Sequence, residues 1–209
     1  MKIKKHRKTD YSILIISDEE TLYKYPEEKI KKMFKGVDLI ISCGDLRNDY
    51  LDYVVTILNK PLVYVSGNHV YNSGHDISFC HQVDGGRIIK IEDLMIVGFD
   101  GSRMYSQGPH QYTEAQMRGQ VLKACAKMLL KKPDIVVSHA PISGFHEGKH
   151  EVHKGFLCFR KALDFLTPKL WLHGHVHLKN HHETQETQYK ETRIINAFGY
   201  KLIHLKKER

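Results

Sequence analysis

Five short apolar runs, each closed by polar residues that can bind a metal ion, set the strongest limit on how this chain can fold. The runs have the length of buried strands, and amphipathic segments separate several of them. Strands that alternate with helices in this way predict parallel strands with helices packed over them. With their polar ends, the runs read SILIISDEE, DLIISCGD, PLVYVSGNH, DIVVSHAP and LWLHGHVH.

The segments between the runs carry signals for helix ends. Pro26 stands where the first helix should start, and Gly36 follows its last turn. Thr113 and Gln116 have the spacing of a capping box at the start of the longest helical pattern. Helices are therefore expected within residues 25–36, 48–60, 112–132 and 155–168.

The remaining segments predict further strands. Residues 86–102 alternate as a hairpin does, with the turn near Glu92 and Asp93. Residues 192–199 and 200–206 are two more strand patterns close to the C-terminal end. Because this part of the chain is rich in strands, we expect a second sheet packed against the first.

Composition suits a single soluble domain. Apolar residues make up 41% of the chain and charged residues 27%, which are ordinary values. We expect one domain over residues 1–209, with residues 1–10 as a basic N-terminal extension. No run reaches the ~18 apolar residues of a membrane span, and the basic start does not suit a secretory signal. The four cysteines are dispersed, which indicates reduced thiols and a cytoplasmic protein.

The chain carries a formal net charge of +8, which admits two interpretations. The charge could attract a phosphate-bearing ligand, nucleic acid included. It could equally reflect basic residues that gather at solvated ends and helix faces. The second interpretation is favoured, because no basic stretch is interleaved with aromatics as a base-stacking surface requires.

The polar ends of the five runs should meet in space. In a parallel sheet the carboxyl ends of the strands share one edge, where ligands bind. Taken singly, Asp18 or Asp45 could cap the next segment, His139 could be a hydrogen-bonded core imidazole, and the GNH triplet could be a turn. Five such endings together favour a cation site. The residues expected to converge are Asp18, Glu20, Asp45, Asn68, His69, His139, His175 and His177.

The order D-x-E, GD, GNH, H, GHxH resembles the calcineurin-like metallophosphoesterase family. The family pattern is D-x-H, GD, GNH followed by an acid, H and GHxH, and the match extends from Ser12 to Leu205. The resemblance implies an α/β fold in which a two-sheet β-sandwich is flanked by helices, in four layers. It also implies two divalent metal ions at one edge of the sheets.

By position, the resemblance implies that Asp45 bridges the two ions and that His69 faces the substrate. His69 would donate a proton to the leaving oxygen or contact the phosphate. Ligation by nitrogen and oxygen without thiolate suits manganese first, with iron or zinc as alternatives. The other ligands would be Asp18, Glu20 and His177 for the first ion, and Asn68, His139 and His175 for the second.

Two positions depart from the family pattern. Glu20 stands where the family has histidine, and it can still ligate through oxygen, whereas Glu19 should point to the opposite face of an extended segment. Val70 stands where an acid usually follows GNH, so a partner that would orient His69 is missing. Asp76 could substitute for that acid.

Substrate-binding candidates come from loops beside the predicted ligands. Arg47 could bind a phosphate oxygen or form a surface ion pair. Arg103 lies in a glycine- and aromatic-rich loop that could be a recognition lid or an ordinary surface loop. His153 and Lys154 could contact phosphate or belong to a solvated basic loop.

The function predicted is hydrolysis of a phosphate mono- or diester by water that two metal ions activate. One alternative is a noncatalytic interaction scaffold, a role that some proteins of this fold, such as a retromer subunit, perform. The retained His69 and second-site ligands favour an enzyme. The other alternative is a small nuclease, which the positive charge suggests but no evident DNA-binding appendage supports.

Overall fold

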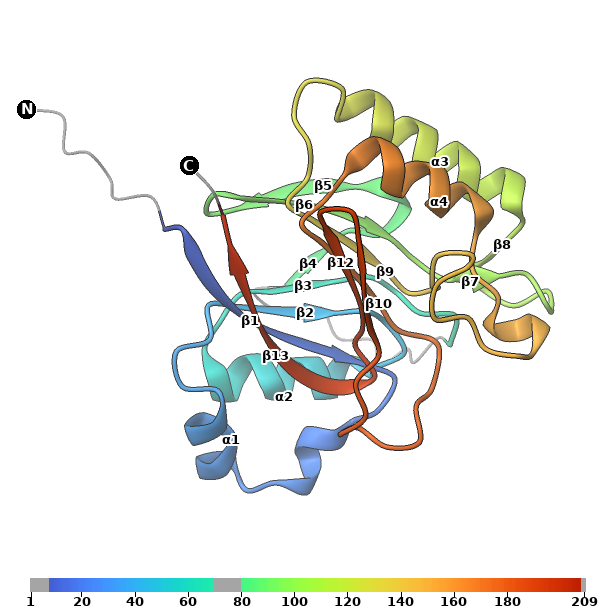
Figure 1. Ribbon diagram of the computed structural model, residues 1–209. Coiled ribbons are helices and arrows are strands. Elements are labelled where there is room, and N and C mark those ends of the chain that lie inside the picture. The colour runs from blue at the N-terminus through green and yellow to red at the C-terminus, as the bar shows by residue number, and fades with distance from the viewer. Residues whose placement is uncertain (1–7, 70–79, 208–209) are drawn as a thin grey trace, which may run out of the picture.

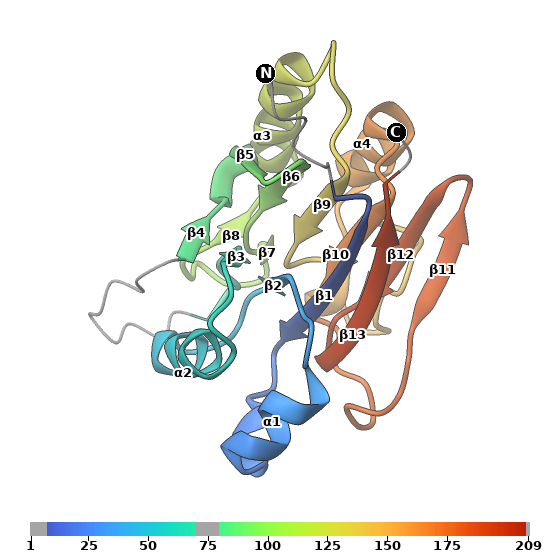
Figure 2. The same cartoon turned by 90° about the vertical axis from the view of Figure 1, so that its left-hand side faces the viewer.

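The computed structural model describes residues 8–69 and 80–207 of the chain. Two sheets lie face to face, and helices cover the outer face of each (Figures 1 and 2). The first sheet has the strand order β13-β1-β2-β3-β4, with β1, β2 and β3 parallel. Its strands are β1 (Asp10–Ser17), β2 (Leu39–Ser42), β3 (Leu62–Tyr64), β4 (Cys80–Gln82) and β13 (Gly199–Lys206).

The second sheet has the strand order β11-β12-β10-β9-β6-β5. Strands β6, β9, β10 and β12 run parallel, whereas β5 and β11 are antiparallel edge strands. A separate two-stranded sheet pairs β7 (Ser102–Arg103) with β8 (Gln111–Tyr112). The strands of the second sheet are β5 (Ile88–Ile91), β6 (Leu94–Phe99), β9 (Ile135–Ser138), β10 (Leu170–His173), β11 (Glu186–Tyr189) and β12 (Thr192–Asn196).

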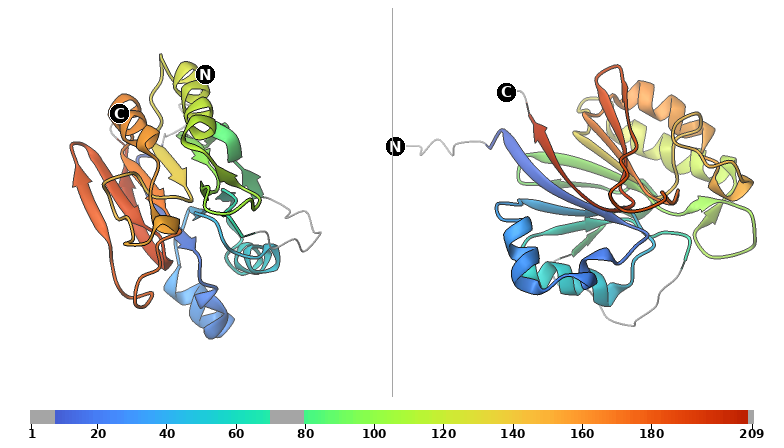
Figure 3. Two further views of the ribbon diagram at one scale, coloured as in Figure 1. Left: turned by 90° about the vertical axis from the view of Figure 1, so that its right-hand side faces the viewer. Right: turned by 60° about the horizontal axis from the view of Figure 1, so that its bottom comes forward.

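Helices α1 and α2 lie on the outer side of the first sheet, and α3 and α4 lie on the outer side of the second (Figure 3). The α-helices are α1 (Glu27–Met33), α2 (Asn48–Leu58), α3 (Glu114–Lys127) and α4 (Leu157–Leu166). The 3₁₀ helices are η1 (Thr21–Lys24), η2 (Asp84–Gly86) and η3 (Glu151–His153).

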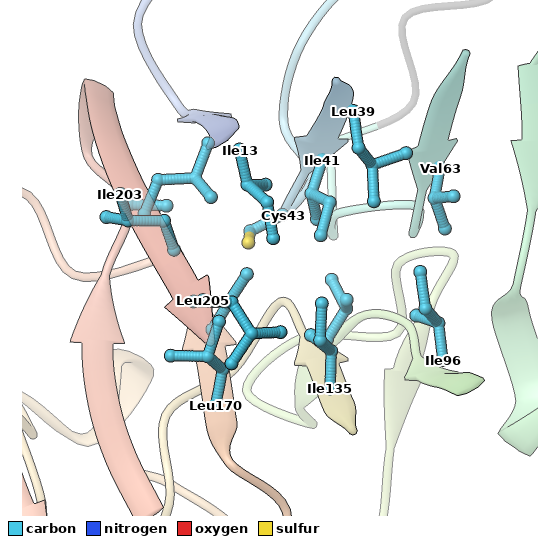
Figure 4. Close-up of a cluster of buried hydrophobic side chains, with 14 of the residues drawn as sticks. Ile13, Leu39, Ile41, Cys43, Val63, Ile96, Ile135, Leu170, Ile203 and Leu205 are labelled. Carbon is cyan, nitrogen blue, oxygen red and sulfur yellow. The ribbon is translucent and has the colours of Figure 1, made fainter. Parts of the chain in front are cut away.

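The core between the sheets is built by alternate residues of the strands. Ile13 and Ile15 of β1 point into this core, whereas Leu14 and Ile16 point outward against α1 and α2. Both faces of β1 are therefore buried, which explains its continuous apolar run. Figure 4 shows side chains of the first sheet meeting Ile96, Ile135 and others from the second.

The predicted four-layer fold is confirmed, and several local predictions hold. Pro26 precedes α1, and Thr113 with Gln116 forms the capping box of α3. Strands β5 and β6 form the predicted antiparallel hairpin, with Glu92 at φ 50° in its turn. The assignment of residues 1–209 to one domain with a basic extension at 1–10 stays a prediction.

The C-terminal strands divide between the two sheets. Strand β12 joins the second sheet as expected of this region, but β13 pairs antiparallel with β1 in the first. The short strands β4, β7, β8 and β11 were not predicted from the sequence, because two to four residues give too little periodicity.

The five runs with polar ends correspond to β1, β2 and β3 of the first sheet and β9 and β10 of the second. Backbone hydrogen bonds join the segments that follow these strands: Asp18 N–H donates to the carbonyl of Gly44, and Gly174 N–H to that of His139. The polar residues thus gather at one end of the sandwich, where the two sheets meet.

Within residues 8–69 and 80–207, no helix combines the length and the apolar character that a membrane crossing needs.

Replacing Ile15 with alanine should lower the free energy of unfolding by ~2–4 kcal/mol, because it leaves a cavity between the sheets. Ile15 is fully buried. Leu122→Ala is the matched control, since Leu122 on α3 is 62% exposed and its loss should cost less than ~0.5 kcal/mol. Urea unfolding measures both values, and equal losses would contradict the assigned core.

Candidate metal centre and active site

Three of the predicted ligands have left-handed backbone conformations. Asp18 has φ 64°, Asp45 has φ 54° and His175 has φ 66°. Such angles are uncommon for residues other than glycine, and they cluster at functional sites where the surrounding structure enforces them. Each residue directly follows or lies near a strand end, so the strained turn directs the side chain away from the apolar core.

His139 lies at the centre of the site and is fully buried. Its Nδ1–H donates to the carbonyl oxygen of Cys43 at 2.8 Å. Its Nε2 lies 3.0 Å from Asn68 Oδ1 and 3.3 Å from Asp45 Oδ2. One ring nitrogen therefore anchors the imidazole to the first sheet, while the other faces two oxygens of the kind that bind metal ions.

Asn68 is oriented by a residue that sequence reasoning did not single out. Its Nδ2 donates to the hydroxyl of Tyr105 at 3.0 Å, which leaves Oδ1 directed toward His139. Tyr105 lies in the segment between β7 and β8. The aromatic content of that segment was the only signal in the sequence.

His175 connects the two halves of the site. Its backbone N–H donates to both carboxylate oxygens of Asp18, at 3.1 and 3.0 Å. Its Nε2–H donates to the carbonyl of Val152 at 2.6 Å, so Nδ1 is the nitrogen left to bind a cation. Asp45, His139 and His175 each bring one ligand atom within 4.8 Å of the others.

His177 lies beside Asp18 at the exposed side of the site. Its Nε2 is 3.6 Å from Asp18 Oδ1, and its ring packs against Phe198 with centroids 5.2 Å apart. The hydrogen bond to Asp18 raises the pKa of His177. The Asp18 side chain itself is fully buried.

The buried charges of the site stabilise one another. Burial disfavours the charged form of Asp45, but the His139 charge and hydrogen bonds from His139 and His69 outweigh it and lower the Asp45 pKa to about 2. Burial opposes the charged form of His139 too, yet the Asp45 carboxylate raises its pKa to about 9. A carboxylate this strongly ionised at neutral pH is a good cation ligand.

These donors fit a divalent cation. His139 Nδ1 is bonded to the carbonyl of Cys43, and Asn68 Nδ2 is bonded to the Tyr105 hydroxyl. The other two atoms, His139 Nε2 and Asn68 Oδ1, therefore lie together beside Asp45. Nitrogen and carboxylate ligands without thiolate suit manganese, iron or zinc.

The backbone of Gly67 lies very close to the Asp45 side chain. A Cβ atom at Gly67 would lie 1.8 Å from Asp45 Oδ1, so any side chain there would displace the carboxylate. The glycine of the GNH triplet thus has a steric role, in addition to its place in the turn.

Glu20 and Arg47, predicted as a metal ligand and a phosphate contact, bind each other. Arg47 Nε donates to Glu20 Oε1 and its Nη2 to Oε2, both at 2.9 Å. This paired arrangement is the strong form of the arginine–carboxylate contact. Glu19 forms an ion pair with Lys24 at 2.6 Å. The ligand role of Glu20 stays a prediction.

His69 follows the predicted ligand Asn68 and borders a cavity of about 200 Å³. Its backbone N–H donates to Asp45 Oδ1 at 2.9 Å, and its ring Nε2 lies 3.9 Å from Asp45 Oδ2. The side chain is 60% exposed, which leaves it accessible to a substrate. Val70 and Asp76 lie outside the described residues.

The other substrate-binding candidates differ in their distance from the ligands. His153 packs against two of them, with ring centroids 5.3 Å from His175 and 6.4 Å from His177. Lys154 borders a separate hollow that also contains Glu147. Arg103 lies in β7.

A second group of three residues that could hold a metal ion contains Asp84, Asp100 and His110. Asp84 accepts hydrogen bonds from the backbone N–H and hydroxyl of Ser66, at 2.8 and 2.6 Å. Burial and the charge of Asp100 raise the pKa of Asp84. Sequence reasoning missed this group because its members follow three different strands without a shared motif.

Behind His175 lies a buried pair of imidazoles that was likewise not predicted. His146 Nδ1 donates to His173 Nε2 at 2.9 Å, and the hydroxyl of Thr187 donates to His146 Nε2 at 2.9 Å. Burial lowers the pKa of His146 to about 4, so both rings are neutral at neutral pH. These hydrogen bonds hold His173, the last residue of β10, in place just before Gly174.

Comparison of the sequence with protein families gives one finding. The sequence model of the family described as calcineurin-like phosphoesterase matches residues 11–179. A search of curated proteins finds no match.

Solved structures of similar shape include TT1561 of Thermus thermophilus, with 14% identity and a TM-score of 0.62 over 95% of this chain and 99% of that one. They also include GAP50, described as the anchor in the inner membrane complex of Plasmodium, with 14% identity and a TM-score of 0.51 over 90% of this chain and 71% of that one. At this identity the likeness shows the fold alone.

The His146 pair should make stability depend on pH. An unfolded imidazole gains a proton below pH ~6.5, whereas folded His146 stays neutral down to about 4. Stability is therefore lost as pH falls through this window, by roughly 2 kcal/mol between pH 7 and 5. Urea unfolding should show a smaller loss in His146→Gln, and an unchanged loss in the exposed control His204→Gln. Equal losses in all three proteins would refute this role.

Proposed function

The chain belongs to the calcineurin-like phosphoesterase family, and from that membership we propose that it is a metal-dependent hydrolase of a phosphate mono- or diester. The observation that carries the proposal is the convergence of Asp45, Asn68 and His139 on one point, with His175 beside them. The family is metal-dependent, and the described residues include groups that could hold a metal ion.

We propose two divalent ions, manganese first, with iron or zinc as alternatives. Asp45 would hold both ions, because its two oxygens face different partners: Oδ1 lies at the His69 backbone and Oδ2 at His139. Asp18, Glu20 and His177 would complete the first ion's ligands, and Asn68, His139 and His175 those of the second.

When bound, such ions supply hydroxide near neutral pH and neutralise phosphoryl charge. The residues of the chain supply the rest. His69, exposed beside Asp45, would donate a proton to the leaving oxygen. The Asp45 carboxylate accepts a hydrogen bond from the His69 backbone N–H. This bond would hold His69 in place relative to the ions.

Four further side chains are proposed as phosphate contacts. His153 has the best support, because its ring packs against the ligands His175 and His177. Arg47 would need to exchange its bonds with Glu20 for bonds to the substrate. For Arg103 and Lys154 the proposal rests on their positions in the sequence alone.

Two alternatives remain in view. A noncatalytic scaffold is favoured by the likeness to GAP50, which is described as an anchor. A small nuclease is favoured by the net charge of +8. The convergent ligands and the accessible His69 support a hydrolase over a scaffold, since an interaction surface has no need of them. We place the protein in the cytoplasm on account of its free cysteines.

Metal-stripped protein should regain hydrolysis of p-nitrophenyl phosphate or bis-p-nitrophenyl phosphate when manganese is returned. Elemental analysis should then find two ions per chain. His69→Ala should keep both ions but lose ~10²-fold in rate, because a general acid contributes about this much. The loss should be smaller for good leaving groups than for poor ones.

Two metal ions without hydrolysis of either ester would favour the scaffold. A metal content near zero, unchanged by added manganese, would contradict the proposal that the chain binds metal ions.

A pair of substitutions tests Glu20. If Glu20 binds the first ion, Glu20→Gln should reduce the metal content from two ions toward one, because the neutral amide is a weaker ligand. Arg47→Gln should leave the content at two, since it removes only the competing ion pair. Should Glu20→Gln retain both ions and match Arg47→Gln in activity, Glu20 serves only to hold Arg47.

A further inference from the structure

His110 forms a dyad with a buried carboxylate. Its Nδ1 lies 2.8 Å from Asp100 Oδ2, and Asp100 is 2% exposed. Two other donors already bind this carboxylate: the Tyr112 hydroxyl at 2.5 Å to Oδ2 and the Gly85 backbone N–H at 2.9 Å to Oδ1. Asp100 is therefore an acceptor, which makes Nδ1 of His110 the protonated donor.

The other ring nitrogen of His110 is available to a ligand. Nε2 makes no hydrogen bond to any residue in 8–69 or 80–207, and the side chain is 33% exposed. His110 borders the same cavity of about 200 Å³ as Asp45 and His69. An imidazole at the edge of a cavity, with one nitrogen held by a carboxylate and the other without a hydrogen bond among the described residues, is suited to bind a ligand.

The backbone fixes His110 relative to the predicted ligands. Gly101 N–H donates to the carbonyl of Ser66 at 2.9 Å, and Ala140 N–H donates to the carbonyl of Gly101 at 3.2 Å. Ser66 lies two residues before Asn68, and Ala140 follows His139.

Gly101 also permits the close approach of His110. It has φ 69°, and a Cβ atom there would lie 1.9 Å from the carbonyl oxygen of His110. Pairing of β7 with β8 closes the segment, with Ser102 N–H donating to that same oxygen at 3.0 Å. The segment that orients Asn68 through Tyr105 therefore also presents His110.

The group does not need a metal ion to explain it. Both oxygens of Asp100 accept hydrogen bonds, and so do both oxygens of Asp84, from Ser66 and Gln82. A carboxylate pair that is fully hydrogen-bonded gains little from a cation. The nitrogen of the group without a hydrogen bond among the described residues is His110 Nε2. In the doubly protonated ring both nitrogens donate, Nδ1–H to Asp100 and Nε2–H to a ligand, and such a ring favours an anionic ligand.

We propose that His110 is a substrate-binding residue, whose Nε2–H donates a hydrogen bond to the phosphate group in the cavity beside Asp45, and that Asp100 positions it. The proposal rests on the proposed hydrolase function and adds a phosphate contact from the segment between β7 and β8. Charged groups that face His110 are Asp100 and Asp84, with the Tyr112 hydroxyl on Asp100.

Nitrogen-15 NMR of histidine-labelled, zinc-loaded protein tests the contact with inorganic phosphate as the probe. Phosphate should shift the His110 Nε2 resonance in a saturable way. His110→Asn should weaken phosphate binding roughly 10-fold, as expected for the loss of one charge-assisted hydrogen bond. Asparagine keeps a donor for Asp100 and tolerates the φ of 50° at this position, so the fold should be retained.

His110→Gln, whose amide can reach the position of Nε2, should restore part of the affinity. Asp100→Asn should move the His110 signals toward the other tautomer and weaken phosphate binding, a change that a purely structural role would not produce. His204→Gln, on an exposed histidine of β13, is the control and should bind phosphate as the unaltered chain does.

A His110 resonance that phosphate leaves unmoved, or an unaltered affinity in His110→Asn, would overturn the proposal. The zinc content of the same samples separates this result from failure of the proposed function. If the chain takes up neither zinc nor manganese, the hydrolase proposal fails, and the titration of metal-free protein still decides whether His110 binds phosphate.

Discussion

The two sheets of this protein pack face to face through an apolar interface, and the candidate site depends on that contact. Asp18, Asp45 and Asn68 follow strands of the first sheet, whereas His139 and His175 follow strands of the second. The hydrogen bond from His139 to the carbonyl of Cys43 crosses from one sheet to the other. A shift of the sheets along their interface would therefore separate the oxygen groups of the candidate site from its imidazole nitrogens.

Charge in the site is balanced by short contacts inside a buried environment. Asp45 and His139 stabilise each other's charged forms despite burial, so their pKa values move in opposite directions, to about 2 and about 9. A cation bound by the proposed ligands would take the place of the His139 proton, since both satisfy the same carboxylate. The left-handed turns at Asp18, Asp45 and His175 hold this arrangement before any ion binds.

The segment that follows β6 joins several residues of the candidate site. Tyr105 holds the Asn68 amide, and the backbone of Gly101 is bonded to Ser66. Neither contact has a periodic signature, so the sequence indicated only a loop rich in glycine and aromatics. The same is true of Asp84, Asp100 and His110, which follow β4, β6 and β7 and share no sequence motif.

From the sequence alone, the longer strands, the four α-helices and the polar residues at the strand ends could be predicted. These features depend on local periodicity and on residues a few positions apart, which a sequence displays directly. Tertiary structure alone decided that β13 returns to the first sheet and that Glu20 pairs with Arg47. It also decided which atom of His139 faces Asp45. Such choices depend on contacts between distant residues, whose partners are selected by packing and by hydrogen-bond geometry once the two sheets have come together.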